Sequence, residues 1–558
     1  MAMLSTLQEQ LKEVVVQSLR ESHKSLKEFP PVILEIPNDK KHGEFSCNIA
    51  LQLAKPLKQP PLDLAAQLVT SIQKNIKASP INANVQKIDV VRPGFINFHL
   101  SPQALYGTLS DVLAQGENYG RASFGKNKKI QVEFVSANPT GPLSVAHARQ
   151  AAVGDALVNI LNFTGFAAKK EFYVNDEGNQ INILGRSVEL RAQELLGEKV
   201  EFSEDCYQGD YIRDMARIYL DQNKIKKAAD LSAKADHIRQ FAVDYLLDVI
   251  KKELDDFGVH FDVWSHQSKI GTQGNIEAVL DFLGEKGFLY EKEGALWFKS
   301  TDFGDDKDRV VEKSDGNYTY LTPDIVYHQN KFKRGFEKII NIWGPDHHGY
   351  IPRIKAVVEA LGYDRDDVEV LIVQLATLYR NGQPISMSTR RGQYISLREV
   401  MTEVGVDAAR FFFLMRRISA HLDFDLELAK KETPENPVYY IQYAHARIYS
   451  VWDKAKELNL RAKHADFSLL NNEEELDLLK KIGQFSGALV LCAEQLDPYA
   501  LVNYLHELAT IFHRFYDKHR VIDQDHALAA ERLALLDASR IVFANGLRLL
   551  GVSTPKKM

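Results

Sequence analysis

The stretch SANPTGPLSVAHARQAAVGD, residues 136–155, decides the fold class because the sequence changes its periodicity there. In the preceding IQVEFVS, apolar residues alternate with Gln131 and Glu133, which is typical of a β-strand. Behind the Gly- and Pro-containing loop, apolar residues recur at helical spacing between residues 152 and 161. The segment KKEFYVND, residues 169–176, is again strand-like. A strand, a loop, a helix and a second strand form a βαβ unit, which predicts a parallel sheet.

Outward from this unit, the patterns predict an α/β multidomain chain. Residues 1–115 mix helical and short β-rich runs and are expected to form a small α+β domain, followed by a polar linker at residues 116–129. Residues 116–432 are expected to hold the parallel sheet, with a mainly helical insertion at about residues 181–290 after which the sheet resumes. Residues 433–558 are helical in pattern throughout and predict an all-α bundle.

The composition is that of an ordinary globular protein, with 558 residues of which 45% are apolar and 26% charged. The three cysteines, Cys47, Cys206 and Cys492, lie far apart, which excludes a disulfide framework and a paired-cysteine zinc site. The N-terminal helix pattern is amphipathic, and no apolar run reaches the ~20 residues of a membrane span. We therefore expect a soluble cytoplasmic protein. The formal charge of −6 argues weakly against a nucleic-acid partner but allows a local basic groove.

The loop before the predicted helix is a candidate phosphate site. In open parallel sheets, ligands bind at the carboxyl ends of the strands, where loops lead into helices. The free N–H groups at the start of the helix suit a phosphate, and His147 on its first turn is placed to add a hydrogen bond or a charge. Taken alone, however, a Gly/Pro loop before a helix more often only turns the chain. The loop is neither a Gly-x-Gly-x-x-Gly motif nor a P-loop.

Four further features favour a ligand with a cationic part and a phosphate part. A carboxylate near the end of a buried strand needs a partner to offset desolvation, and arginines on a small-residue loop can close over a polyanion. For each feature alone, a solvated loop or a structural ion pair remains the alternative. A metal site in WGPDHHG is the weaker alternative, since it lacks a third spaced ligand. The features are Glu133 in VEFVS, Tyr320 and Asp324 in YLTPD, Asp346 with His347 and His348 in WGPDHHG, and Arg390 with Arg391 in ISMSTRRGQ.

Nine stretches, in this order, resemble the class I aminoacyl-tRNA synthetases, and closely the arginyl-tRNA synthetases of bacterial type. The resemblance implies a Rossmann-like catalytic domain at residues 116–432, an N-terminal domain contacting the tRNA elbow at residues 1–115, and an anticodon-binding domain at residues 433–558. The stretches are DKKHGEFSCNIALQLAK, RPGFINFHLS, VEFVSANPTGPLSVAHARQAAVGDAL, FGDDKDRVVEKSDG, YLTPDIVYH, WGPDHHGY, MSTRRGQYISLREV, NPVYYIQYAHAR and RLLGVSTPKKM.

The two class signatures occur with departures. The His-Ile-Gly-His signature falls on residues 144–147, so that Ser144 replaces a histidine, Ala146 replaces a glycine, and His147 matches the second histidine. The Lys-Met-Ser-Lys-Ser signature falls on residues 386–390, where both lysines are lost. Serine can still donate a hydrogen bond but carries no charge. The resemblance implies that the catalytic residues are His147, Ser144 and Arg390, and that the ATP site comprises Ser144, Ala146, His147, Gly344, His348, Met387, Ser388, Arg390 and Arg391.

The implied reaction has two steps. The arginine carboxylate attacks the α-phosphate of ATP, which carries Mg²⁺, and arginyl-adenylate then passes arginine to the terminal ribose of tRNA; no protein-bound zinc is implied. Chemistry of this kind needs mainly positioning and charge stabilisation. A guanidinium presents five donors in a plane and favours surrounding carboxylates. By resemblance, the arginine pocket comprises Glu133 and Asp324 on the guanidinium, the Tyr320 hydroxyl beside it, Asn138 on the backbone end, and Asp346 on the α-amino group.

The two end domains are implied to bind tRNA, and a monomer is expected. YYIQYAHAR and FHRFYDKHR interleave aromatic residues with Arg and His, which suits base stacking beside phosphates. About half of Tyr440, Tyr443, Phe512 and Phe515 are instead expected in the bundle core. Removal of residues 433–558 is expected to abolish charging far more than folding of the catalytic part. The alternatives are another specificity such as cysteine, whose zinc ligands are lacking, and a non-catalytic paralogue that binds RNA or arginine.

Overall fold

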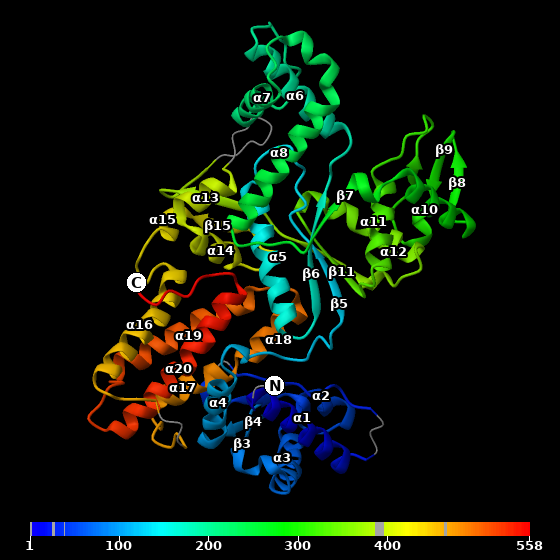
Figure 1. The fold of residues 1–558 in the computed structure, drawn as a ribbon. Helices are drawn as coiled ribbons and strands as arrows, with labels where there is room; N and C mark the ends of the chain where they lie inside the picture. The colour runs from blue at the N-terminus through cyan, green and yellow to red at the C-terminus, as the bar shows by residue number, and fades with distance from the viewer. Residues whose placement is uncertain (1–2, 25–27, 38, 386–394, 463–465) are drawn as a thin grey trace.

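A five-stranded sheet lies at the centre of the molecule, in the order β12-β11-β5-β6-β7, and every neighbouring pair of strands is parallel (Figure 1). The predicted βαβ unit is present as β5, α5 and β6, with β5 and β6 adjacent. The carboxyl ends of β5, β6 and β11 therefore meet at one edge, where loops lead into helices. The elements are β5 (Lys129–Glu133), α5 (Val145–Phe163), β6 (Ala167–Val174), β7 (Val263–His266), α11 (Leu321–Lys333), β11 (Lys338–Trp343), α12 (Ile351–Ala360) and β12 (Val368–Ile372).

This computed structural model describes residues 3–24, 28–37, 39–385, 395–462 and 466–558. It confirms the α/β multidomain class, with a parallel sheet, a smaller N-terminal α+β part and a helical C-terminal part. Within these ranges, the helices are all too short or too polar to cross a bilayer.

The predicted insertion at residues 181–290 is more than helical. Three helices form a protruding arm at the top of Figure 1, but the chain then adds the edge strand β7 to the central sheet. A four-residue strand inside a polar region has too little pattern to be recognised. The β-rich run after it forms a separate antiparallel sheet, β10-β9-β8, rather than resuming the central one. The elements are α6 (Asn179–Leu195), α7 (Asp210–Asn223), α8 (Ala235–Asp256), α9 (Gln267–Ile270), α10 (Gln273–Glu285), β8 (Leu289–Lys292), β9 (Ala295–Phe298) and β10 (Arg309–Glu312).

The N-terminal part is an antiparallel sheet covered by helices, with the strand order β1-β2-β4-β3. A short turn joins β3 to β4, which allows these two strands to pair antiparallel, and β2 pairs antiparallel with β4 although α2 and α3 separate it from them in the chain. The elements are α1 (Met3–Ser22), β1 (Leu34–Glu35), β2 (Phe45–Cys47), α2 (Ile49–Leu57), α3 (Pro61–Lys77), β3 (Val85–Val91), β4 (Phe95–Leu100) and α4 (Pro102–Gln115).

The C-terminal part is helical, as predicted, and a small three-stranded sheet precedes it. The small sheet and its helices are β13 (Ala376–Arg380), β14 (Gln383–Pro384), α13 (Leu397–Val404), α14 (Val406–Leu414), β15 (Leu422–Asp425) and α15 (Leu426–Ala429). The bundle is α16 (Pro437–Glu457), α17 (Glu473–Gly483), α18 (Phe485–Gln495), α19 (Tyr499–Lys518) and α20 (His526–Leu549).

The three parts share one hydrophobic core, which runs from Leu7 in α1 to Val552 beyond α20. Tyr119, inside the predicted linker, is fully buried and stacks on Phe485 of α18 with ring centroids 6.2 Å apart. The Tyr106 hydroxyl of α4 donates to the Leu470 carbonyl at 3.0 Å. Removal of residues 433–558 would expose this shared core, so we expect it to impair folding of the catalytic part as well as charging.

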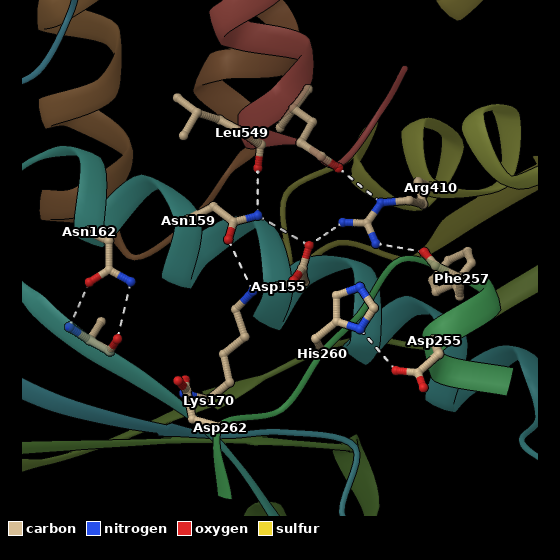
Figure 2. A network of polar contacts seen from close by, with 12 residues as sticks. Asp155, Asn159, Asn162, Lys170, Asp255, Phe257, His260, Asp262, Arg410 and Leu549 are labelled. Carbon is tan, nitrogen blue, oxygen red and sulfur yellow. Dashed lines mark hydrogen bonds and ion pairs between the residues drawn. The ribbon is translucent and has the colours of Figure 1, made fainter. Parts of the chain in front are cut away.

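The buried Arg410 links the C-terminal end of the chain to the sheet region through hydrogen bonds (Figure 2). Arg410 of α14 donates to the Leu550 carbonyl at 3.1 Å and the Phe257 carbonyl at 2.9 Å, and it pairs with Asp155 of α5. Lys170 of β6 also pairs with Asp155, at 2.5 Å. Burial alone raises the pKa of Asp155, but the charges of Arg410 and Lys170 outweigh it and hold that pKa below its ordinary value.

Candidate active site

The turn after β5 fixes the orientation of Glu133. Glu133 ends the strand and is 8% exposed. Val135 and Ser136 follow with φ of 66° and 38°, a left-handed region that a β-branched residue rarely adopts. The Ser136 hydroxyl donates to Glu133 Oε1 at 3.0 Å and accepts from the Tyr173 N–H at 3.1 Å. This strained turn therefore ties the carboxylate to the end of β6, as strained backbone often does at functional sites.

Lys331 of α11 supplies the partner that a buried Glu133 needs. The Lys331 side chain is fully buried, and its Nζ donates to Glu133 Oε2 at 2.6 Å and to Asn341 Oδ1 at 2.9 Å. The same ammonium lies 4.2 Å from the ring centroid of Tyr327. Its charge is thus stabilised by a carboxylate, an amide oxygen and an aromatic face.

Asp324, in the first turn of α11, belongs to the same cluster. The Tyr350 hydroxyl donates to Asp324 Oδ2 at 2.6 Å. Burial raises the pKa of Asp324 to about 6; the Tyr350 bond opposes this rise, and the negative charge of Glu133 adds to it. The two carboxylates predicted to bind a cationic head therefore lie close enough to feel each other's charge.

The first turn of α5 carries a neutral histidine. Ser144 is the residue before α5, and its N–H donates to His147 Nδ1 at 3.1 Å. Burial lowers the pKa of His147 to about 4, which the charge of Asp346 only partly offsets. Because Nδ1 accepts a bond, the neutral ring carries its proton on Nε2. His147 therefore offers a hydrogen bond rather than a charge, and Ala146 lies beside it on the same turn.

The loop before α5 is bound by segments that are remote in sequence. Ser144 forms a β-bridge with Ser396, and the Leu143 carbonyl accepts from the Leu397 N–H at 2.7 Å. The Leu143 N–H in turn donates to Glu253 Oε2 of α8 at 3.2 Å. The first signature is therefore held against residues 396 and 397, which begin the helix α13 region. Met387, Ser388, Arg390 and Arg391 themselves lie outside the described residues.

The turn after β11 comes close to α5. A Cβ on Gly344 would meet Asp346 Oδ1 at 2.6 Å and Gln150 Nε2 of α5 at 3.6 Å. Asp346 and His348 are exposed, and Asp346 pairs with His347 at 3.3 Å. Since the charge of Asp346 acts on His147, Asp346 lies on the side of the α5 N-terminus, whereas Tyr350 at the end of the same turn binds Asp324 in the carboxylate cluster.

Two further predicted residues, Asn138 and Tyr320, lie outside the cluster around Asp324. Asn138 donates to Gln180 Oε1 of α6 at 2.8 Å, which ties the signature loop to the protruding arm. Tyr320 precedes α11 and is 69% exposed, so its hydroxyl is not part of the described cluster around Asp324.

Sequence reasoning missed Lys331 and Tyr350. Lys331 follows Asp324 by seven residues, two turns of one helix, which puts both on the same face. That spacing was a usable signal, but three basic residues in NKFKRG gave no reason to choose this one. Tyr350 comes from the turn after β11, and only the tertiary fold brings it to Asp324.

Family profiles match almost all of the chain. Residues 6–100 match the arginyl tRNA synthetase N terminal domain, residues 108–414 match the catalytic domain of the class I (R) tRNA synthetases, and residues 441–558 match the DALR anticodon binding domain.

Individual relatives agree with these profiles. An arginine–tRNA ligase of Bacillus subtilis is 45% identical over 563 residues, covering 100% of this chain and 99% of the relative. One from Bacillus licheniformis is 44% identical over 558 residues, covering 99% of each. The solved arginyl-tRNA synthetase of Thermus thermophilus has the same fold, with a TM-score of 0.76 at 21% identity over 99% of this chain and 100% of its own. This chain belongs to the arginyl-tRNA synthetases.

Proposed function

We propose that the protein attaches arginine to tRNA, with ATP as the energy source. The arginine carboxylate attacks the α-phosphorus of ATP, the bond to the β-phosphate breaks, and pyrophosphate leaves. A terminal ribose hydroxyl of tRNA then attacks the arginyl carbonyl, and AMP leaves. The observation that carries this proposal is a buried carboxylate cluster beside a helix N-terminus at one edge of the parallel sheet.

The cluster suits a guanidinium. Asp324 is proposed as its ion-pair partner and Glu133 as a fixed hydrogen-bond acceptor, since burial strengthens both interactions. Asn138 is proposed to hold the backbone end of arginine, Asp346 its α-amino group, and Tyr320 to add a hydroxyl once it turns inward. Citrulline would leave Asp324 without a countercharge, and such mismatches can cost ~10⁴-fold.

The α5 N-terminus suits the phosphates of ATP. We assign His147 Nε2–H and the Ser144 hydroxyl as donors, with Ala146, Gly344 and His348 lining the nucleotide. Met387, Ser388, Arg390 and Arg391 are proposed to close over the pyrophosphate, because arginines stabilise polyphosphate charge well. Mg²⁺ would arrive with ATP and neutralise part of that charge. The protein's own contribution is positioning and hydrogen bonding.

An aminoacylation assay with total tRNA and each amino acid in turn tests the proposal. Charging with arginine alone is the expected result. Charging with another amino acid would overturn the pocket assignment. Retained tRNA binding without any charging would instead favour the non-catalytic paralogue.

Both ends of the chain are proposed to hold tRNA, residues 1–115 at the elbow and residues 433–558 at the anticodon, around a catalytic domain at residues 116–432. The α16–α19 surface supports the second assignment, since the Arg447 guanidinium lies 4.9 Å from the Tyr443 ring and 4.3 Å from the Tyr516 ring. Tyr440 and Tyr443 are half-buried. Phe512 and Phe515, by contrast, are fully buried core residues. We propose that the enzyme acts as a cytoplasmic monomer, as the family resemblance implies.

We expect Tyr443→Ala to weaken tRNA binding by roughly tenfold, since base stacking on an aromatic side chain contributes about 1–3 kcal/mol. The KM for tRNA should rise while the melting temperature changes little, because the side chain is only half-buried. Tyr443→Phe is the matched control and should retain tRNA affinity, since it keeps the ring face. Equal losses in both variants would argue against stacking.

The KM for arginine should depend on pH through Asp324. The pKa of this carboxyl is raised to about 6 in the free protein, and the guanidinium needs the ionised form. Above pH 6 the KM should be flat, and below it the KM should rise about tenfold per pH unit, because protons compete with arginine. Steady-state charging at several pH values measures this, with the KM for ATP as the internal control. An arginine KM that is flat down to pH 5 would contradict it.

A further inference from the structure

A layer of buried charged side chains lies between α11 and the central sheet. Asn341, Glu133 and Glu171 stand in register on the adjacent strands β11, β5 and β6. Lys331 of α11 binds Glu133 at 2.6 Å, and Arg334, the residue directly after α11, binds Glu171 at 2.8 Å. Each of these two strand carboxylates therefore has its own basic partner from the helix or from the residue after it.

Asp324 differs from both. Among the ion pairs formed by the described residues, none includes Asp324. Its side chain accepts a bond from the neutral hydroxyl of Tyr350 at 2.6 Å. A guanidinium brings one positive charge, and Asp324 is the carboxylate of this cluster that has no ion-pair partner among the described residues.

Building on the proposed function, we propose that Lys331 is a positioning residue that sets the net charge of the arginine pocket. Its ammonium group neutralises Glu133, so that a single negative charge, on Asp324, is left for the guanidinium. Glu133 then serves as an acceptor of fixed orientation, since Ser136 holds Oε1 and Lys331 holds Oε2. The pocket with arginine bound is electrically balanced, which a buried site requires.

Removal of the Lys331 charge would leave Glu133 and Asp324, two neighbouring carboxylates, without an ion-pair partner among the described residues. Glu133 already raises the pKa of Asp324, and Lys331 lowers it. Without Lys331, Asp324 would hold its proton at a higher pH, and arginine would have to displace that proton to bind. In the pH profile of kcat/KM for arginine, the fall on the acidic side, here called the acid limb, would therefore move to higher pH.

Asp324 is the group of this cluster that titrates near pH 6, because the shifted pKa values of its neighbours lie far from that pH. Burial lowers the pKa of His328 to about 3 and raises the pKa values of Tyr173, Tyr327 and Tyr350, so these groups keep one charge state across the neutral range. The charged and titratable groups that face Asp324 and Lys331 are Glu133 on β5, Glu171 and Tyr173 on β6, Tyr327 and His328 on α11, Arg334 directly after α11, Tyr350 in the turn after β11, and Arg353 on α12.

The test is the pH profile of kcat/KM for arginine, at saturating ATP and tRNA, for the wild type, Lys331→Met, Lys331→Arg and Lys333→Met. We expect Lys331→Met to move the acid limb up by about one pH unit or more, since an opposite charge at this range shifts a pKa by 1–3 units. A shift of one unit lowers kcat/KM about twofold at pH 7 and about tenfold at pH 5, and this loss should be recovered at alkaline pH. Lys331→Arg keeps the charge and should leave the limb in place.

Lys333→Met is the matched control, because Lys333 lies two residues away on α11 but is exposed and binds only Gln329 in the described structure, at 2.7 Å. Its limb should not move. A folded Lys331→Met protein that loses activity equally at every pH, or keeps the wild-type limb, would overturn the inference.

Should Lys331→Met fold poorly, the double variant Glu133→Gln/Lys331→Met replaces the ion pair by a neutral pair. It should return the limb to the wild-type position at reduced activity, and a limb that stays displaced would contradict the proposal. A wild-type protein that does not charge arginine would instead refute the proposed function itself.

Discussion

Asp324→Asn is expected to lower kcat/KM for arginine by roughly 10³-fold while leaving the affinity for ATP nearly unchanged. Loss of one partner from a buried charge pair costs about 3–5 kcal/mol, and each ~1.4 kcal/mol is a factor of ten. The substitution keeps the shape of the side chain and an oxygen that can accept from the Tyr350 hydroxyl, so the local fold should persist. Steady-state charging gives the arginine parameter, and direct nucleotide binding gives the ATP affinity.

Asp281→Asn is a suitable control for this variant, because Asp281 is exposed on α10, outside the carboxylate cluster. It should behave as the wild type in both measurements. The pH dependence of the arginine KM should also disappear in Asp324→Asn, since the titrating group is gone. Near-normal kcat/KM for arginine would refute the assignment of Asp324 as the guanidinium partner.

Arg410→Leu is expected to lower the free energy of unfolding by about 3–5 kcal/mol, the usual cost of breaking a buried ion pair. Arg410 is fully buried, and its loss would leave the Leu550 and Phe257 carbonyls without this donor and Asp155 with Lys170 as its remaining ion-pair partner (Figure 2). The space around it is tight, because a Cβ on Gly551 would lie 2.2 Å from Arg410 Nη2. Denaturant unfolding measures the change.

Arg417→Leu serves as the matched control, since Arg417 is an exposed arginine that follows α14 closely. Its guanidinium binds Gln495 at 3.3 Å on the surface, where such contacts contribute little. Its unfolding midpoint should stay near that of the wild type. Equal stability of the two variants would show that the Arg410 junction does not hold the C-terminal end.

The sequence sufficed for features that are local in the chain. The change from strand to helix periodicity around Ser144 predicted the βαβ unit, and the order of the motifs predicted the family. The residue pattern singled out Glu133 and Asp324 as carboxylates at the edge of the sheet, the family resemblance assigned both to one guanidinium, and the structure brings them into one cluster. The short edge strand β7 and the buried Tyr119 were missed. A strand of four residues and a single buried residue are both too short to show a periodic hydrophobic pattern.

The amino-acid sequence by itself determined the fold class, the helical end and the identity of the chemical groups, because periodicity and motif spacing act within a few neighbouring residues. Only the tertiary structure decided which charges are already matched. Lys331 pairs with a residue 198 positions away, Arg410 with one 255 away, and His147 loses its charge through burial. Desolvation and ion pairing depend on what surrounds a side chain in space, and the order of residues along the chain does not contain that information.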